Sequence, residues 1–488
     1  MNTAISKIVG ELEAAIGARA VLTDDDALSS ASYDYTEEPA RRPSVVVRPT
    51  SVEDVQAIVR TAARERLALT VRVAGSNVGG LAIAPSGGIV VDLSAMNRIV
   101  AINEADMVAI LEPGVTWEQL KARLEHDGLA LRLGYPLSPP DTSVVANCLL
   151  DGLGNLSMRH GSMADWIGGL EVVLPDGSLA RTGAGALSDV WFGRGPLPDL
   201  TGLFVNWQGT TGIVTKLAFQ LWPTPPLRQR LFVPVGHRDD AFNVMRALCR
   251  RPLADDVGAL SWPTGKMVLG VDKPLVRDDG EPELFLYVDM SGENGAELAL
   301  RRGLLDQMLA NLRQAGARLE APLELSRLVK LSPRFAELAE FPTRLSFLVD
   351  HPGGGLSWLG TYGPMSRFEP FADAGVAIMR RYETPPILVS RPMKGGHFGV
   401  MRFITRFDRR DADARQRVRE MIGELLEAGL DLGFVPYKTP PWMIPRLRPR
   451  LDAGFQRLMN TVRQALDPSG IMAPHCWPPD PALATLDG

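Results

Sequence analysis

A glycine-rich loop between two apolar runs constrains the fold of this chain more than any other feature. The first run, residues 69–74, is rich in β-branched side chains and leads into residues 75–80, which we call the glycine loop; the second covers residues 89–93. Glycine tolerates positive φ and leaves the backbone open, so successive N–H groups can form a concave site for a diphosphate. A doubly wound dinucleotide fold needs a helix directly after such a loop, whereas this one leads into a strand. An ordinary surface turn is the alternative, and the flanking elements must decide.

Composition and charge describe a globular chain of more than one lobe. At 488 residues it is too long for one ordinary core, so two or three lobes are expected. The formal charge of −5 is weak for this length and argues against nucleic acid and anionic membrane as partners. Its 3 cysteines are far apart and odd in number, which argues against a disulfide framework and a cysteine zinc site. We therefore predict no metal site.

The N-terminus and the apolar runs bear on the location of the protein. Residues 1–20 have the pattern of an amphipathic helix and lack the unbroken apolar core of a signal peptide. No apolar run approaches the ~18 residues that a membrane span needs. A cytoplasmic protein is expected.

The elements around the glycine loop predict a small α+β lobe. Residues 45–74 have the pattern of a strand, a helix and a second strand, and Thr50 with Glu53 forms a candidate capping box before the helix. A second capped helix is expected after Thr116. The long segment 134–168 is rich in proline, glycine and small polar residues, and a loop of this length inside a compact domain is usually functional.

A proline-rich break at residues 222–226 marks the boundary to a second α+β lobe. Its expected helices lie near 239–250, 294–315 and 410–429, and its expected strands near 283–290, 343–349 and 398–407. The resulting division is residues 1–227, 228–444 and a C-terminal segment 445–488 that returns to the first lobe.

Several stretches of the chain, in order, resemble the vanillyl-alcohol oxidase/p-cresol methylhydroxylase family of flavoproteins. They are Arg48-Pro-Thr-Ser-Val-Glu-Asp-Val, Gly75-Ser-Asn-Val-Gly-Gly, Val90-Val-Asp-Leu-Ser, Leu111-Glu-Pro-Gly-Val-Thr, Gly169-Leu-Glu-Val-Val-Leu-Pro-Asp-Gly, Gly212-Ile-Val-Thr-Lys, Tyr437-Lys-Thr and Leu466-Asp-Pro-Ser-Gly-Ile-Met-Ala-Pro. The resemblance implies an α+β fold, with a two-subdomain FAD-binding lobe and a cap domain whose own antiparallel sheet is flanked by helices. FAD would lie between the two subdomains, with the substrate held under the cap against the flavin ring.

The resemblance also implies which residues contact FAD. The glycine loop would hold the diphosphate, the long loop would pass beside the flavin, and the strand after Gly212 would touch the cofactor through its backbone. The candidates are Gly75, Ser76, Asn77, Val78, Gly79, Gly80, Ser138, Asn147, Asp151, Gly152, Gly154, Asn155, His160, Gly161, Ile213 and Val214. We expect non-covalent FAD, because relatives attach it through His or Tyr and the matching cap segment offers only Tyr362, out of register.

Tyr437 and Lys438 match a tyrosine–arginine pair that in the family holds the phenolate of a 4-substituted phenol. A phenol of pKa near 10 must lose its proton before its electrons can push a hydride from the benzylic carbon to flavin N5. Lysine departs from the pattern, because it offers charge without the bidentate fork of arginine. His397 and Arg402 lie on an expected cap strand that can face the substrate.

A second departure concerns the family's aspartate near flavin N5. It falls at about Ser138 here, and Asp141 is the nearest acidic substitute. The catalytic candidates are therefore Tyr437, Lys438, His397, Arg402 and Asp141.

Three functions stay open at this point. The first is an FAD-dependent oxidase or dehydrogenase acting on a 4-alkylphenol or related lignin-type aromatic. The second keeps FAD but oxidises a 2-hydroxy acid or another alcohol, with Arg402 and His397 binding a carboxylate. The third is a non-catalytic flavin-binding electron-transfer subunit. Oxygen or a cytochrome would reoxidise the flavin, and a homodimer is expected.

Overall fold

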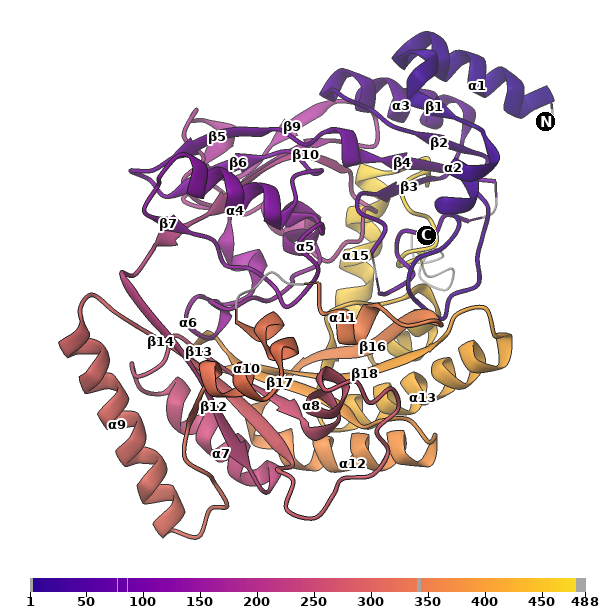
Figure 1. The fold of residues 1–488 in the computed structure, drawn as a ribbon. Coiled ribbons are helices and arrows are strands. Elements are labelled where there is room, and N and C mark those ends of the chain that lie inside the picture. The colour runs from indigo at the N-terminus through magenta and orange to yellow at the C-terminus, as the bar shows by residue number, and fades with distance from the viewer. Residues whose placement is uncertain (1–2, 77, 86, 340–343, 480–488) are drawn as a thin grey trace.

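The computed structural model describes residues 3–76, 78–85, 87–339 and 344–479, which form two lobes (Figure 1). The first lobe is built on a four-stranded and a five-stranded sheet, and the second on one eight-stranded sheet. Its described helices are α1 (Thr3–Ile16), α2 (Asp25–Ser30), α3 (Val52–Glu65), α4 (Trp117–His126), α5 (Val144–Leu149), α6 (Ser157–His160), α7 (Arg238–Cys249), α8 (Trp262–Val268), α9 (Gly295–Gln314), α10 (Leu325–Leu331), α11 (Ser346–Val349), α12 (Phe368–Arg381), α13 (Ala412–Asp431), α14 (Ile444–Leu447) and α15 (Ala453–Leu466).

The four-stranded sheet of the first lobe carries the glycine loop. Its order is β1 (Val21–Leu22), β2 (Val45–Val47), β4 (Ile89–Asp92) and β3 (Leu69–Arg72). Strands β2 and β3 both run parallel to β4, so the glycine loop lies on the crossover from β3 to β4. Helix α3 begins one residue later than predicted, because Ser51 is the N-cap and Asp54 completes the capping box. The second predicted capping box, Thr116 with Gln119 before α4, is confirmed.

The five-stranded sheet of the first lobe is antiparallel. Its order is β5 (Ile99–Asn103), β6 (Val108–Leu111), β10 (Ile213–Gln220), β8 (Ile167–Val173) and β9 (Leu179–Arg181). A small pair, β7 (Leu131–Arg132) with β11 (Trp222–Pro223), lies where the chain leaves this lobe. The cores of both first-lobe sheets are apolar, and Val173 of β8 and Ile213 of β10 join the core of the four-stranded sheet.

All eight strands of the second sheet pair antiparallel, which confirms the predicted fold class. The order is β15 (Leu323–Glu324), β12 (Leu227–Val235), β14 (Leu284–Gly292), β13 (Asp256–Ser261), β17 (Ile387–Met393), β18 (Phe398–Asp408), β16 (Gly354–Gly363) and β19 (Val435–Pro436). The predicted strand near 343–349 is wrong for its described part, because residues 346–349 form helix α11. A short apolar run does not by itself distinguish a buried strand from a buried helix.

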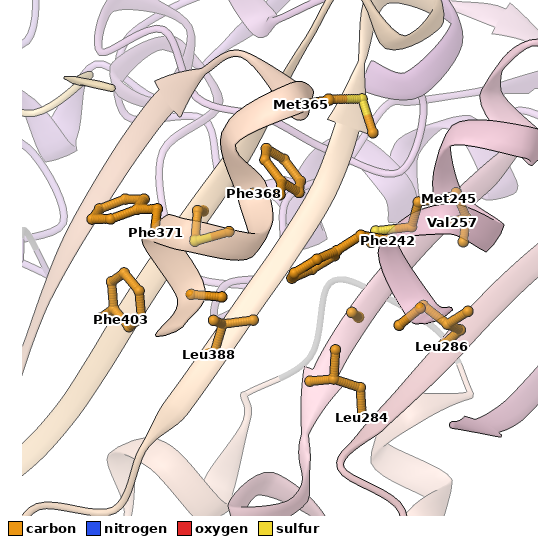
Figure 2. Packing of buried hydrophobic residues seen from close by; sticks show 14 of the residues in the cluster. Phe242, Met245, Val257, Leu284, Leu286, Met365, Phe368, Phe371, Leu388 and Phe403 are labelled. Atoms are coloured by element: carbon orange, nitrogen blue, oxygen red, sulfur yellow. The ribbon is translucent and has the colours of Figure 1, made fainter. Parts of the chain in front are cut away.

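Helices α7, α12 and α13 cover the face of the eight-stranded sheet that points away from the first lobe (Figure 1). Phe242, Phe368 and Phe371 from α7 and α12 pack with Phe403 of β18 in the core on this face (Figure 2). The opposite face packs toward the first lobe, since Val389 of β17 and Ile404 of β18 belong to the core cluster that contains the five-stranded sheet. The eight-stranded sheet thus has two buried faces, one against helices and one against the other lobe.

The end of the chain returns to the first lobe beside the glycine loop. After α15, Ile471 accepts a hydrogen bond of 2.8 Å from the Leu69 N–H of β3, and the Ala473 N–H donates to the Leu69 carbonyl at 2.9 Å. Figure 1 shows α15 running between the two lobes. Residues 471–473 thereby cover the outer edge of the sheet that presents the loop.

Candidate active site

A large cavity lies between the two lobes. Its empty volume is about 1900 Å³, including space open to solvent. Its first-lobe wall comes from three segments: residues 71–76 at the end of β3, residues 136–153 of the long loop, and residues 208–214 at the start of β10. Its second-lobe wall is mostly apolar and is formed by Leu345, Leu348, Val349, Leu356, Trp358, Val389, Arg402, Ile404, Tyr437 and Lys438.

The glycine loop presents open backbone to this cavity. Gly75 has a φ of 67°, a conformation that favours glycine, and it lines the cavity together with Ser76 and Val78. Among the described residues, the backbone N–H groups of Ala74, Gly75 and Ser76 have no hydrogen-bond acceptor. Unpaired N–H groups that converge on a cavity form an anion site, which fits the predicted diphosphate.

The remaining glycine-loop candidates are placed differently. Asn77 lies outside the described residues. Neither Gly79 nor Gly80 is among the described cavity-lining residues. Gly80 instead has a φ of 66° and packs against the Glu38 side chain, where an added Cβ would lie 2.6 Å from Cγ.

The long loop contributes only part of the set predicted from the sequence. Ser138, Asn147 and Gly152 line the cavity. The other candidates, Asp151, Gly154, Asn155, His160 and Gly161, are not among the described lining residues.

Those five residues make contacts within the loop or with its surroundings. The Asn155 side chain accepts a 2.9 Å hydrogen bond from the Tyr135 N–H, which pins the loop to itself. The Gly154 carbonyl accepts from Arg391 of β17, and His160 is exposed, with its ring 5.2 Å from that of Trp222.

The third segment places backbone and amide groups beside the same space. Ile213 and Val214, both predicted, line the cavity at the start of β10. Gln208 and Gly209 also line it and were not predicted, although the glycine–threonine run before β10 was the signal for them. The Gln208 side-chain oxygen is buried and has no partner in the described structure, which leaves it available to a bound donor.

The polar groups of the second-lobe wall gather at one point. The Arg402 Nε of β18 donates a 2.8 Å hydrogen bond to the Tyr437 hydroxyl, which follows β19. The Lys438 ammonium lies 5.0 Å from the ring centroid of Trp358, and the Arg402 guanidinium carbon lies 5.8 Å from it. Burial and the neighbouring Arg402 charge lower the pKa of Lys438 to about 7. The sequence did not predict Trp358, which lies on β16.

Two of the predicted catalytic residues do not reach the cavity. Asp141 is exposed, and the lining passes through Thr142 instead. His397 is exposed in the turn before β18.

Tyr362, the candidate for covalent attachment, lies behind Tyr437 and outside the described lining. The two rings stack at 4.8 Å, and the Tyr362 hydroxyl donates to the Asp151 carbonyl at 2.6 Å.

The described residues contain no group of three or more His, Cys, Asp or Glu side chains placed to hold a metal ion. Within the same ranges, no helix combines the length and the apolar character that crossing a membrane requires. Cys148, Cys249 and Cys476 are all free and buried.

Comparisons with known proteins differ in how much of the chain they cover. A family model described as an FAD binding domain matches residues 43–183. The 4-cresol dehydrogenase [hydroxylating] flavoprotein subunit of Pseudomonas putida is 24% identical over 96% of this chain and 94% of that protein. The mitochondrial D-lactate dehydrogenase [cytochrome] of Arabidopsis thaliana is 33% identical over 38% of this chain, which spans only 31% of that protein.

The fold of the chain matches that of a solved structure over nearly its whole length. The crystal structure of p-cresol methylhydroxylase with substrate bound superimposes with a TM-score of 0.85 over 98% of both chains, at 21% sequence identity. The resemblance that the sequence motifs indicated is therefore confirmed. The match to an FAD binding domain, together with the open backbone of the glycine loop, identifies the cofactor as FAD.

Proposed function

Because the chain is an FAD-binding oxidoreductase with the fold of p-cresol methylhydroxylase, we propose that it oxidises a 4-substituted phenol at its benzylic carbon. The observation that carries this proposal is the group of Arg402, Tyr437 and Lys438 on the otherwise apolar second-lobe wall. The apolar side chains suit an aromatic ring, and the three polar groups suit one oxygen atom that becomes negative.

In this proposal FAD lies along the first-lobe wall. The unpaired N–H groups of the glycine loop would hold its diphosphate, and the backbone at Ile213 and Val214 would border the ring system. When bound, FAD supplies the hydride acceptor. We propose non-covalent attachment, because the Tyr362 hydroxyl is engaged with the Asp151 carbonyl away from the cavity.

We further propose that residues 1–227 bind FAD, that residues 228–444 cover the substrate, and that residues 445–488 return to the FAD-binding part. The hydrogen bonds between Leu69 and residues 471–473 support the last assignment. Since these bonds lie directly before the glycine loop, the C-terminal segment would help to fix the loop in place.

The residues of the second-lobe wall would prepare the phenol for oxidation. The positive charge of Arg402 and the Tyr437 hydroxyl would stabilise the developing phenolate, and such preorganised groups act most strongly where water is excluded. Val389 and Ile404 are buried and would pack against the ring.

A 2-hydroxy acid is the second candidate substrate, because Arg402 with Tyr437 can also bind a carboxylate. Similarity to D-lactate dehydrogenase, however, covers only 38% of this chain, whereas similarity to the 4-cresol dehydrogenase subunit covers 96%. The similarity to the 4-cresol dehydrogenase subunit therefore includes the second lobe, which favours a phenol as the substrate.

Anaerobic reduction of the flavin tests the proposal. The holoprotein is mixed with 4-ethylphenol or with D-lactate, and bleaching of the flavin absorbance is followed by rapid mixing. We expect bleaching with the phenol only. Bleaching with D-lactate alone would favour the hydroxy-acid reaction, and bleaching with neither would favour an electron-transfer subunit. Addition of oxygen or cytochrome c to the reduced protein then identifies the kind of electron acceptor.

A further inference from the structure

We propose that Lys438 is the base that removes the phenolic proton, and that it enters the reaction as a neutral amine. This inference rests on the proposed function and assigns a distinct task to one residue of the site. A cation that only stabilises the phenolate and a base that creates it make different demands on the surroundings of the lysine.

The first argument is the position of Lys438. It lines the cavity directly after β19, next to Tyr437, and its nitrogen lies over the face of Trp358 at 5.0 Å. Among the described residues, no carboxylate forms an ion pair with it. A lysine that served as a permanent cation would gain stability from a carboxylate partner, and none is provided here.

The second argument is the charge around it. Arg402 of β18 places a positive charge at the same wall, and Trp358 of β16 offers no counter-charge. Among the described residues, the acidic group that acts on the lysine is Asp34 of the N-terminal segment, and burial raises the pKa of that carboxyl to about 6. Burial and repulsion by Arg402 outweigh it and lower the pKa of Lys438 to about 7. At neutral pH much of the lysine is therefore a free amine with an available lone pair.

The third argument is the direction of the neighbouring hydrogen bond. The Tyr437 hydroxyl accepts from Arg402 at 2.8 Å and has no acceptor of its own among the described residues. Its proton is thus available to donate to the phenol oxygen, which leaves the phenol O–H to point at another acceptor. Arg402 cannot accept a proton, since an arginine stays charged at any working pH. Lys438 is the group in this cluster that can.

The proposed step balances as follows. The phenol O–H bond breaks, an N–H bond forms, and a phenolate and a lysine ammonium result. The phenolate electrons then form the carbonyl of a neutral quinone methide as the benzylic carbon loses hydride to FAD. The proton stays on Lys438 and leaves to solvent when the product is released.

The variant Lys438→Arg separates the two roles, because it keeps the cation and removes the base. At saturating 4-ethylphenol, the wild-type rate of flavin reduction should rise about tenfold per pH unit below pH 7 and level off above it. In Lys438→Arg the rate at pH 7 should fall by about 10²–10³-fold, as expected for loss of a general base. It should recover toward pH 10, where the phenol ionises by itself.

Lys394→Arg is the matched control, because Lys394 is exposed and pairs with Asp165 away from the cavity. It should keep the wild-type pH profile, and FAD content should be the same in all three proteins. A wild-type rate and pH profile in Lys438→Arg would overturn the proposal and leave the lysine only a cation.

A measurement without turnover gives a second test. 4-Fluorophenol has no benzylic hydrogen, and its fluorine chemical shift differs between phenol and phenolate. At pH 8 the wild type should bind the probe as a phenolate without releasing a proton to the medium, because the lysine takes the proton up. Release of about one proton on binding, or a bound neutral phenol, would overturn the proposal. If wild-type protein neither binds this probe nor is reduced by 4-ethylphenol, the phenol-oxidising function itself is wrong, and the role of Lys438 falls with it.

Discussion

The two walls of the cavity differ in which parts of the chain form them. The first-lobe wall includes short runs of residues that are close in sequence, such as Gly75 and Ser76 of the glycine loop and the start of β10. The polar part of the second-lobe wall is made of Trp358, Arg402 and Lys438, which come from β16, β18 and the segment after β19. A binding site formed by backbone groups can be recognised in the sequence from a short stretch of glycines. A site formed by side chains from distant strands can be recognised only once the pairing of those strands is known.

Strand register explains which second-lobe residues reach the cavity. Trp358 of β16 stands opposite Ile404 of β18, and Arg402 lies two residues before it, on the same face. His397 lies one residue before β18, in a turn where it is exposed, so strand register does not place it on either face of the sheet. A sequence that places His397 and Arg402 on one strand does not reveal that the strand begins only after His397.

The largest expected effect comes from a residue that joins the two lobes. Arg391 of β17 is buried, donates to the Gly154 carbonyl of the long loop, and pairs with the buried Asp256 at 3.2 Å. Arg391→Met should lower the free energy of unfolding by about 3–5 kcal/mol, because it leaves a buried carboxyl without its cation. Urea unfolding of wild type and variant measures this difference.

The same variant has a defined pH dependence. Burial raises the pKa of Asp256 to about 7, above its value in the unfolded chain. The folded state then binds the extra proton, so stability falls as the pH rises from about 4 to 7, the window between the unfolded and folded pKa values. Losing Arg391 raises this pKa further, and the destabilisation should be greater at pH 8 than at pH 5. An equal loss at both pH values would mean that Asp256 does not depend on Arg391.

The second-largest expected effect is on FAD affinity and concerns the glycine loop of the first-lobe wall. Gly75→Val forces a β-branched residue into positive φ, at a cost of ~1–3 kcal/mol, and its Cβ would collide with the Arg72 guanidinium, so the glycine loop would have to shift. FAD affinity of the apoprotein should fall by about 5–150-fold from the strain alone, since each 1.4 kcal/mol is tenfold. Quenching of flavin fluorescence on titration measures it.

Ser76→Ala is the control for this variant, because it removes a hydroxyl and keeps the backbone. It should change the affinity much less than Gly75→Val does. If the two variants weaken FAD binding equally, the backbone of the glycine loop is not what holds the diphosphate.

The fold and the first-lobe wall were largely predictable from the sequence. The strands flanking the glycine loop and the α4 capping box follow from local patterns, the antiparallel sheet of the second lobe was implied by the family resemblance, and all are present. Errors at the first-lobe elements are small, such as Ser51 in place of Thr50 as the N-cap of α3. Local hydrogen-bond chemistry decides these features, and the sequence contains it.

The site predictions that failed concern residues whose role depends on tertiary contacts. In the long loop, Asn155 and Gly154 have the residue types of a cofactor site but hold the loop to Tyr135 and to Arg391. The contribution of Trp358 required the pairing of β16 with β18, which no single stretch reveals. Polar residues on a functional loop thus divide into those that shape it and those that line the cavity.

The smallest expected effect concerns the two catalytic candidates that the structure leaves outside the cavity. Asp141 and His397 are both exposed, and neither is among the described lining residues. A group that does not touch substrate or FAD changes reaction rates only through the fold, and exposed substitutions usually alter stability by less than about 0.5 kcal/mol. Asp141→Asn and His397→Ala should therefore each leave flavin reduction by 4-ethylphenol within about twofold of wild type, since twofold corresponds to only about 0.4 kcal/mol of barrier. A tenfold loss in His397→Ala, measured by rapid mixing at saturating phenol and with unchanged FAD content, would mean that the turn before β18 moves onto the substrate during the reaction, and the second-lobe wall would then include a part that strand register does not define.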